Sequence, residues 1–379
     1  MINSVNLNNF RGFNDITVPL SQVSMLTGLN GVGKTTVLEA LYCLFSETRL
    51  DVSALARYNR TIGLLFSQLN GIPSLASRPA YNYRLFWDEC PMSIEKPCLI
   101  SAKSSDGTTW QWSYKKAKTA NLEPSLVRDA GLMNIPLDST TEVADFKWQH
   151  SGILFDKSHQ KNNINDKINK AQILNPDNAL YLIPPESKIL SLCRFIDFAS
   201  IRAMPQELPY RTAQRLTEAL KIINPHITDV RISKIENGLS VILDNSMETT
   251  IGTIGNGAVT WLSTMIVIYE LIDQYKVDRQ TNIPIFILID EIGAGIHYSL
   301  MHDIWKYIRN LIQTYPQIQF VVTSHNDDCV RSFCEVFVEQ NKSASIVRLH
   351  KPIDSEIIPT VYDVSQFEAI MTGEWEVRG

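Results

Sequence analysis

The 379-residue sequence lacks several features that mark common protein classes. Its 35 Lys and Arg stand against 40 Asp and Glu, for a formal net charge of −5, so it has no overall basic excess of the kind seen in many nucleic-acid-binding proteins. Its six cysteines form no C-x-x-C pair. This argues against the usual zinc and thioredoxin-type motifs and favours reduced thiols in a cytoplasmic protein.

Leader segments, membrane spans and long repeats are also missing. Residues 1–10 have neither the basic region nor the apolar core of a signal peptide. The most apolar stretch, from Trp261 to Ile272, is interrupted by Glu270 and is too short to cross a membrane. Heptad arrays and short-period repeats do not occur. We therefore expect a cytoplasmic globular protein without a membrane partner.

Residues 28–36, Gly-Leu-Asn-Gly-Val-Gly-Lys-Thr-Thr, fill the phosphate-binding pattern G-x-x-x-x-G-K-[ST] without a mismatch. An apolar run precedes this loop and a helical spacing of apolar residues follows it, so a strand–loop–helix unit is predicted. Glycines allow the backbone N–H groups to face a polyphosphate. Lys34 would reach the β- and γ-phosphates, and Thr35 would bind Mg²⁺.

A carboxylate pair follows a second apolar run. Residues 283–289 suit a central parallel strand that is buried on both faces, and Asp290 and Glu291 come directly after it. Ligands of α/β sheets bind at this end of the strands. We expect Asp290 to hold Mg²⁺, through water, and Glu291 to orient and deprotonate the attacking water. The alternative is a capping pair at a strand exit.

Two further segments complete the set of candidate site residues. A strand at 318–322 ends in Thr323-Ser324-His325, where His325 would hydrogen-bond the γ-phosphate. Gly255-Asn256-Gly257 lies before an apolar helix predicted at 259–275. It has either an anion-binding geometry or the geometry of a tight turn that enters a core helix.

The rest of the sequence predicts further strands, helices and a loop. Asp106-Gly107 predicts a hairpin turn, followed by alternating aromatics that include Trp110 and Trp112. These aromatics either face the core or form a surface on which bases stack. Residues 156–172 are rich in Lys, Asn and Gln and predict a surface loop. Helices are predicted near 208–223 and 302–315, and hairpin strands between 230 and 243.

Together these elements resemble an ABC-type ATPase head of the SMC, RecF and OLD lineage. The resemblance rests on the motifs described above together with Asn9 to Phe13, Leu38-Glu39-Ala40 and Gly293 to His297. It implies an α/β fold in which a mixed central sheet has helices on both faces, plus an antiparallel β subdomain. The expected parts are an N-terminal lobe (1–47), an inserted β-rich and helical segment (48–178) and a C-terminal lobe (179–379).

The resemblance also implies a mechanism in which two heads pair head-to-tail and enclose ATP. One subunit would contribute the catalytic residues Glu291 and His325 and the metal-binding residues Thr35 and Asp290. The partner would contribute a signature loop, here Gly255, Asn256 and Gly257. This loop departs from the Leu-Ser-Gly-Gly-Gln form, which bears on the rate of hydrolysis. The implied nucleotide-binding residues are Asn30, Gly31, Gly33, Lys34, Thr35, Thr36 and Arg11.

Two absences narrow the branch. No heptad arms of the SMC type separate the motifs, and the sequence ends at Gly379, too soon after His325 for the Toprim nuclease domain of OLD proteins. The chain therefore resembles the standalone ATPases of two-gene anti-phage systems such as PARIS and Septu. We expect an oligomeric Mg-dependent ATPase that acts as sensor or scaffold for a separate effector, a nuclease, with DNA or a phage protein as further partners. The alternatives are a RecF-like DNA-repair ATPase and a scaffold that binds ATP without hydrolysing it.

Overall fold

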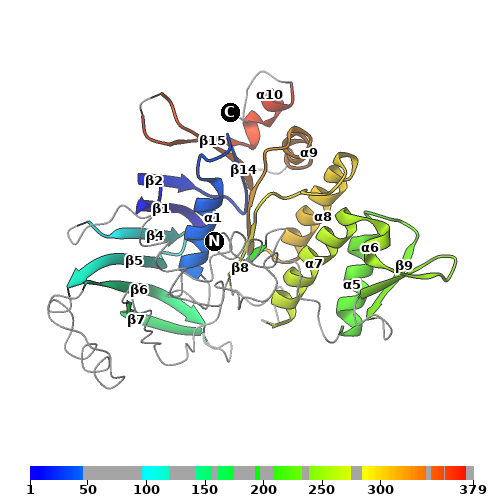
Figure 1. The fold of residues 1–379 in the computed structure, drawn as a ribbon, viewed down its shortest axis with the longest axis horizontal. Helices are drawn as coiled ribbons and strands as arrows, with labels where there is room; N and C mark the ends of the chain where they lie inside the picture. Colours follow the sequence, from blue (N-terminus) through cyan, green and yellow to red (C-terminus); the bar gives the residue numbers. More distant parts are fainter. Residues whose placement is uncertain are drawn as a thin grey trace, which may run out of the picture. The chain divides into compact units, whose positions relative to one another are not determined.

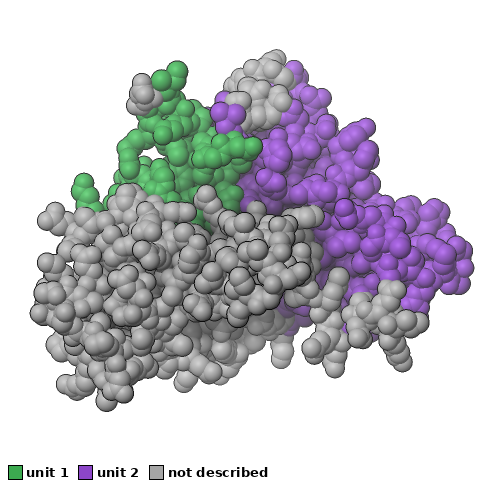
Figure 2. Space-filling model, viewed as in Figure 1, with its two compact units in different colours: residues 1–20, 30–193, 349–359 green, residues 21–29, 194–348, 360–379 purple. Residues whose placement is uncertain are grey.

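The structure, a computed structural model, describes residues 1–45, 96–118, 142–155, 161–174, 193–196, 208–232, 239–274, 284–338, 343–353 and 355–372. They form an α/β protein that divides into two compact units (Figures 1 and 2). Unit 1 comprises residues 1–20, 30–193 and 349–359, and unit 2 comprises residues 21–29, 194–348 and 360–379.

Unit 1 is built around a six-stranded antiparallel sheet with the strand order β2-β1-β4-β5-β6-β7. Its strands are β1 (Ile2–Phe10), β2 (Phe13–Pro19), β4 (Cys98–Ser104), β5 (Thr109–Lys118), β6 (Glu142–Phe155) and β7 (Lys161–Leu174). Along β4 buried residues alternate with more exposed ones, as the pleat of a strand with one buried face requires. The turn at Gly107 lies where the sequence predicts it.

Helix α1 (Lys34–Phe45) covers this sheet and contacts β1, β4 and β5. The ring of Phe45 meets Trp110 edge-on with centroids 5.2 Å apart, and Phe10 meets Trp112 in the same way at 6.2 Å. Trp110 is 4% exposed and Trp112 is fully buried. The base-stacking interpretation is therefore wrong for these two tryptophans, which form the core of unit 1.

Strand β7 corrects the prediction of a surface loop at 156–172. Residues 161–174 pair antiparallel with β6, so that Ile168 lies opposite His150 and Ala171 opposite Lys147. Main-chain hydrogen bonds hold such a strand, and a strand at the end of a sheet often carries charged side chains. A composition rich in Lys and Asn therefore does not exclude a strand here. Residues 156–160 lie outside the described part of the chain.

Unit 2 contains a second six-stranded sheet, with the order β15-β14-β3-β13-β12-β8. Its strands are β3 (Val23–Thr27), β8 (Cys193–Ile196), β12 (Ile285–Ile289), β13 (Ile318–Thr323), β14 (Ala344–His350) and β15 (Ile358–Asp363). The four strands β14, β3, β13 and β12 pair in parallel. Every residue of β3, β12 and β13 is buried, as their continuous apolar sequences predict.

The helices and a small sheet complete unit 2. The helices are α5 (Tyr210–Leu220), α6 (Ile251–Ile254), α7 (Asn256–Gln274), α8 (Met301–Thr314), α9 (Asp327–Phe337) and α10 (Phe367–Met371), with single 3₁₀ turns at Tyr298–Leu300 and Val364–Gln366. The small antiparallel sheet, β11-β10-β9, consists of β9 (Ile227–Ile232), β10 (Leu239–Leu243) and β11 (Glu248–Thr250). The predicted helices and hairpin strands of this region are confirmed.

Helices α8 and α9 pack together through Trp305 and Phe333, whose ring centroids are 4.9 Å apart. None of the helices in the described residues combines the length and the apolar character needed to cross a membrane. The mixed α/β class is confirmed. The ABC-type assignment and the division at residues 47 and 178 stay predictions.

Candidate functional site

The carboxyl ends of three parallel strands meet at one edge of the unit 2 sheet. Leu26 of β3 pairs with Thr323 of β13, and Val322 of β13 pairs with Ile289 of β12. The Ser324 N–H donates to the Leu26 carbonyl at 3.2 Å, which ties the two strand ends together. The start of the phosphate loop, the segment that follows β13 and the carboxylate pair after β12 therefore share the edge where α/β sheets bind ligands.

Asp290 is the first residue after β12 and is 7% exposed. Its Oδ1 accepts a hydrogen bond from the Thr323 hydroxyl at 2.8 Å. Its main-chain N–H donates to the Ile196 carbonyl of β8 at 2.9 Å. The carboxylate thus has a fixed orientation at the end of a buried strand, which both the metal-binding and the capping interpretations accommodate.

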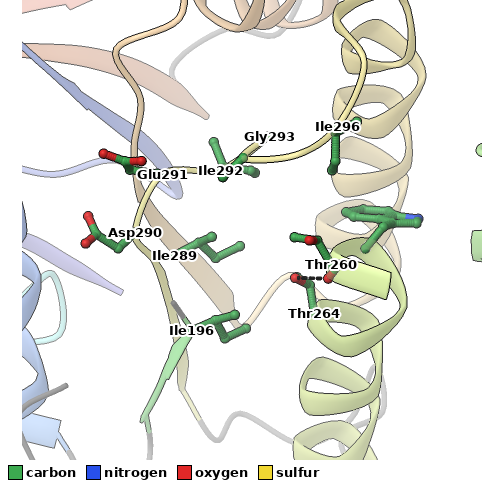
Figure 3. A pocket seen from close by; sticks show the side chains of 11 residues that line it. Ile196, Thr260, Thr264, Ile289, Asp290, Glu291, Ile292, Gly293 and Ile296 are labelled. Carbon is green, nitrogen blue, oxygen red and sulfur yellow. Dashed lines mark hydrogen bonds between the residues drawn. The ribbon is translucent and has the colours of Figure 1, made fainter. Parts of the chain in front are cut away.

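Glu291 follows with a left-handed backbone, φ 57°. Such a conformation is uncommon outside glycine, and it concentrates at functional sites. Its N–H donates to Thr323 Oγ1 at 2.7 Å, and its carbonyl accepts from the Ala294 N–H at 3.0 Å. Figure 3 shows the carboxylates of Asp290 and Glu291 directed to the same side.

The structure brings His325 to Glu291, as the predicted site requires. His325 Nδ1 lies 3.6 Å from Glu291 Oε1, and both side chains are more than half exposed. The carboxylate and the imidazole, at the end of a parallel sheet, are therefore both accessible to solvent.

The phosphate loop has the backbone that its sequence predicts. Gly28, Gly31 and Gly33 have φ values of 127°, 80° and 101°. A Cβ on Gly33 would collide with the Phe13 ring, so a glycine is required there for space as well as for conformation. Asn30 to Thr36 belong to unit 1, and Lys34, Thr35 and Thr36 form the first turn of α1. The Val37 N–H donates to the Gly33 carbonyl at 3.1 Å, which joins loop and helix.

Arg11 lies in the β1–β2 turn with φ 51°, and its side chain is buried. Its guanidinium pairs with the carboxylate of Glu39 on α1, which is fully buried. Its role as a nucleotide contact stays a prediction. This pairing is not among the features predicted from the sequence, although a glutamate between the apolar residues Leu38 and Ala40 of a core helix indicates a buried ionic partner.

The expected signature residues lie at the junction of α6 and α7, Gly255 between the helices and Asn256 and Gly257 in the first turn of α7. Gly255 has φ 126°, and Asn256 begins α7. A Cβ on Gly257 would lie 2.8 Å from the Gly295 carbonyl oxygen and 3.2 Å from Ile296 Cα. This segment therefore packs on the loop that follows the carboxylate pair of its own chain. A role toward a second subunit stays a prediction.

A small pocket lies behind the carboxylate pair, between the end of β12 and α7 (Figure 3). Its volume of about 20 Å³ has room for one or two water molecules only. It is lined by Ile196, Thr260, Trp261, Thr264, Ile289, Asp290, Glu291, Ile292, Gly293, Ala294 and Ile296. The pocket is too small and too apolar to be the nucleotide site.

The metal-binding prediction can be judged by the ligand atoms available. The Asp290 carboxylate and the Thr35 hydroxyl are oxygen donors of the kind that Mg²⁺ prefers. Among the described residues no cluster of three or more His, Cys, Asp or Glu side chains could hold a metal. The role of Thr35 and Asp290 as Mg²⁺ ligands stays a prediction.

A family model described as an AAA ATPase domain matches residues 1–70, which include β1, β2, β3, the phosphate loop and α1. No curated protein matches the chain. The match supports a P-loop ATPase family and, with it, ATP binding and hydrolysis.

Proposed function

We propose that the protein binds ATP with Mg²⁺ and hydrolyses it. The observation that carries the proposal is the shared edge of the unit 2 sheet, where the first residue of the phosphate loop, Asp290, Glu291 and His325 follow adjacent parallel strands. An exposed carboxylate beside an imidazole at this edge suits hydrolysis of the terminal phosphoanhydride bond of a bound nucleotide.

Each residue has one role in this reaction. Lys34 binds the β- and γ-phosphates, and Thr35 and Asp290 hold Mg²⁺, which neutralises phosphate charge when it is bound. Glu291 orients the water and takes its proton, because its exposed carboxylate is a hydrogen-bond acceptor next to His325. His325 donates a hydrogen bond to the γ-phosphate.

Phosphate release by the purified protein, with Mg²⁺ and with a chelator, tests the proposal. Glu291→Gln should lower kcat by about 10²-fold or more, the typical contribution of a general base, and should still bind a fluorescent ATP analogue. Lys34→Ala should lose that binding. Glu218→Gln, at an exposed position of α5, is the matched control and should behave like the wild type. Wild-type turnover in Glu291→Gln, or no turnover in the wild type, would refute the assignment.

At a finer level we propose an ABC-type head that pairs head-to-tail, with Gly255, Asn256 and Gly257 facing the nucleotide of the partner. This rests on the order of the motifs and on their likeness to the OLD branch. It extends to a role in which the ATPase assembles with a separate effector nuclease in antiviral defence and responds to DNA or a phage protein.

Two measurements address this finer proposal. Mass photometry of Glu291→Gln should show a larger oligomer with ATP than without it, and affinity purification with the neighbouring gene product should recover the effector. A monomer without a partner would contradict both points. The RecF-like alternative instead predicts ATP-dependent DNA binding that weakens steeply as salt is raised.

A further inference from the structure

We infer that Thr323 is a positioning residue for the ATP hydrolysis proposed above, on which this inference rests. Its one hydroxyl fixes the carboxylate of Asp290 and the main chain of Glu291 relative to each other. The sequence alone does not indicate this role for Thr323. In the sequence, Thr323 is only a neighbour of the candidate His325, and it lies far along the chain from Asp290.

The hydrogen bonds of the Thr323 hydroxyl have a defined direction. Thr323 is the last residue of β13 and is 1% exposed. The Glu291 N–H can only donate, so Thr323 Oγ1 accepts from it at 2.7 Å. The Thr323 hydroxyl therefore donates its own hydrogen bond to Asp290 Oδ1, at 2.8 Å. Because Thr323 is buried from solvent, the two bonds constrain both neighbours together.

The main chain of Thr323 extends this control by one residue. Its carbonyl accepts a hydrogen bond from the Ile292 N–H at 3.0 Å. Residues 290 to 292 are the first three after the end of β12. Each of them has a hydrogen bond to Thr323, through the Asp290 carboxylate, the Glu291 N–H and the Ile292 N–H. The left-handed backbone of Glu291 lies in the middle of this segment, where surrounding contacts must stabilise an unfavourable conformation.

Loss of the hydroxyl should therefore affect the chemistry more than nucleotide binding. The Thr323 hydroxyl bonds to the Asp290 carboxylate and to the main chain of Glu291, whereas the phosphate loop is formed by residues 28–36. Nucleotide binding should therefore depend less on this hydroxyl than the position of Glu291 does. Misplacement of a reacting group by about 1 Å can cost on the order of 10²-fold in rate. We expect Thr323→Val to lower kcat by about 10- to 100-fold and to change KM for ATP by less than about threefold, since the loop contacts remain.

The test compares Thr323→Val, which keeps the shape, with Thr323→Ser, which keeps the hydroxyl. Serine should restore kcat to within about threefold of the wild type. The matched control is Thr217→Val, because Thr217 is also buried and its hydroxyl donates to the Ala213 carbonyl within α5, away from the site. This control should leave kcat unchanged, and thermal melting will show that each variant is folded.

A second readout does not depend on turnover. Binding of a fluorescent ATP analogue should require several-fold more Mg²⁺ in Thr323→Val than in the wild type, because the Asp290 carboxylate loses its fixed orientation. Thr323→Ser should need the wild-type concentration. An unchanged Mg²⁺ requirement in a folded Thr323→Val protein, together with unchanged kcat, would overturn the inference.

The outcomes also separate this inference from the proposed function. If Glu291→Gln abolishes turnover and Thr323→Val changes neither kcat nor the Mg²⁺ requirement, the ATPase assignment stands and the inference fails. If the wild type does not hydrolyse ATP, the assignment fails, and the Mg²⁺ requirement alone decides the inference. In a Glu291→Gln background, Thr323→Val should cause little further loss of kcat, because both act through one group.

Should Thr323→Val not fold, Thr323→Cys takes its place, because it retains most of the side-chain volume but offers only a weak S–H donor. A folded Thr323→Cys protein with wild-type kcat and Mg²⁺ requirement would overturn the inference. A loss of kcat that serine reverses supports it.

Discussion

Gly257 at the start of α7 lies against the carbonyl oxygen of Gly295, with no space between them for a side chain. A Cβ there would be 2.8 Å from that oxygen, closer than a carbon and a main-chain oxygen approach in folded proteins. Gly295 itself has a left-handed backbone, φ 75°, in the loop that follows Asp290 and Glu291. The candidate signature segment and the candidate catalytic segment are therefore packed backbone to backbone within unit 2.

Gly257→Ala should consequently destabilise the protein and displace the catalytic loop. The atoms that the new Cβ would meet are main-chain atoms, which cannot move away as the end of a flexible side chain could. We therefore expect a loss of about 1–3 kcal/mol in the free energy of unfolding, the usual cost of overpacking. Urea denaturation measures it. Gly252→Ala is the matched control, since Gly252 lies in α6 with open space around its Cβ position and should lose no stability. Equal stability of the two variants would contradict the packing described.

The buried pair of Arg11 and Glu39 makes a second prediction possible. Both side chains are almost inaccessible to water, and they join the β1–β2 turn to α1 in unit 1. Removing one partner leaves an uncompensated charge, which typically costs about 3–5 kcal/mol. Arg11→Ala should therefore lower the free energy of unfolding by roughly that amount in urea denaturation.

A control for this effect is the exposed pair of Lys221 and Glu218 on α5, where Lys221→Ala should cost less than about 1 kcal/mol. The double variant Arg11→Met with Glu39→Leu, which removes both charges, should recover most of the stability that Arg11→Ala loses. If Arg11→Ala is as stable as Lys221→Ala, the pair has no structural importance. A loss of ATP affinity without a loss of stability would instead favour the predicted nucleotide contact of Arg11.

The sequence predicts those parts of the site that depend on local pattern. Gly33 and Lys34 follow a fixed spacing, and Asp290 and His325 each come shortly after a continuous apolar strand. Parallel strands of an α/β sheet end at a common edge, so the approximate meeting of the carboxylate pair with His325 could be inferred without coordinates. The family match to residues 1–70 supports the same local reading of the phosphate loop.

Other parts depend on pairing that no local pattern encodes. Thr323 reaches Asp290 because β12 and β13 pair with Ile289 opposite Val322, and a different register would bring another residue there. The contact of Gly257 with Gly295 requires the relative position of a helix and a loop. Strand β7 was missed because its antiparallel pairing with β6 is a long-range feature that a sequence rich in Lys and Asn does not indicate.

The buried cysteines of α9 give a prediction about pH. Burial raises the pKa of the Cys329 thiol to about 11 and that of Cys334 to about 12. In the unfolded chain both thiols titrate near pH 8.5. The folded state therefore keeps the protons longer, and the stability that this provides is fully present below about pH 8.5 and lost as the pH rises toward 11 and 12.

Thiol alkylation followed by mass spectrometry checks this expectation. At pH 8 the alkylating reagent should modify Cys329 and Cys334 at least about 10²-fold more slowly in the folded protein than in the denatured protein. The reason is that the reactive thiolate is rare and inaccessible in the folded state. The urea-unfolded chain at the same pH is the control. Rapid modification of either cysteine in the folded state would show that α9 opens readily or that the burial is wrong.

Arg215 of α5 links three helices of unit 2, and its replacement is the last prediction. Its Nη1 lies 2.7 Å from Asp273 Oδ1 on α7, and its Nη2 donates to the Tyr315 hydroxyl after α8 at 3.1 Å. Its guanidinium also lies over the ring of Tyr269, 5.2 Å from the centroid. A lysine ammonium on a flexible chain cannot make these three contacts at once.

Arg215→Lys should therefore lower the free energy of unfolding by about 1–2 kcal/mol although the charge is kept, a loss that urea denaturation resolves. Arg231→Lys is the control, because Arg231 pairs only with a neighbouring exposed aspartate, Asp229, in the described part of the chain and should cost less than about 0.5 kcal/mol. The helix that Arg215 ties down through Asp273 is α7, which begins at the candidate signature. The variant should therefore also weaken any ATP-dependent association that uses Asn256 and Gly257, and unchanged stability together with unchanged association would show that the planar guanidinium is not needed at this junction.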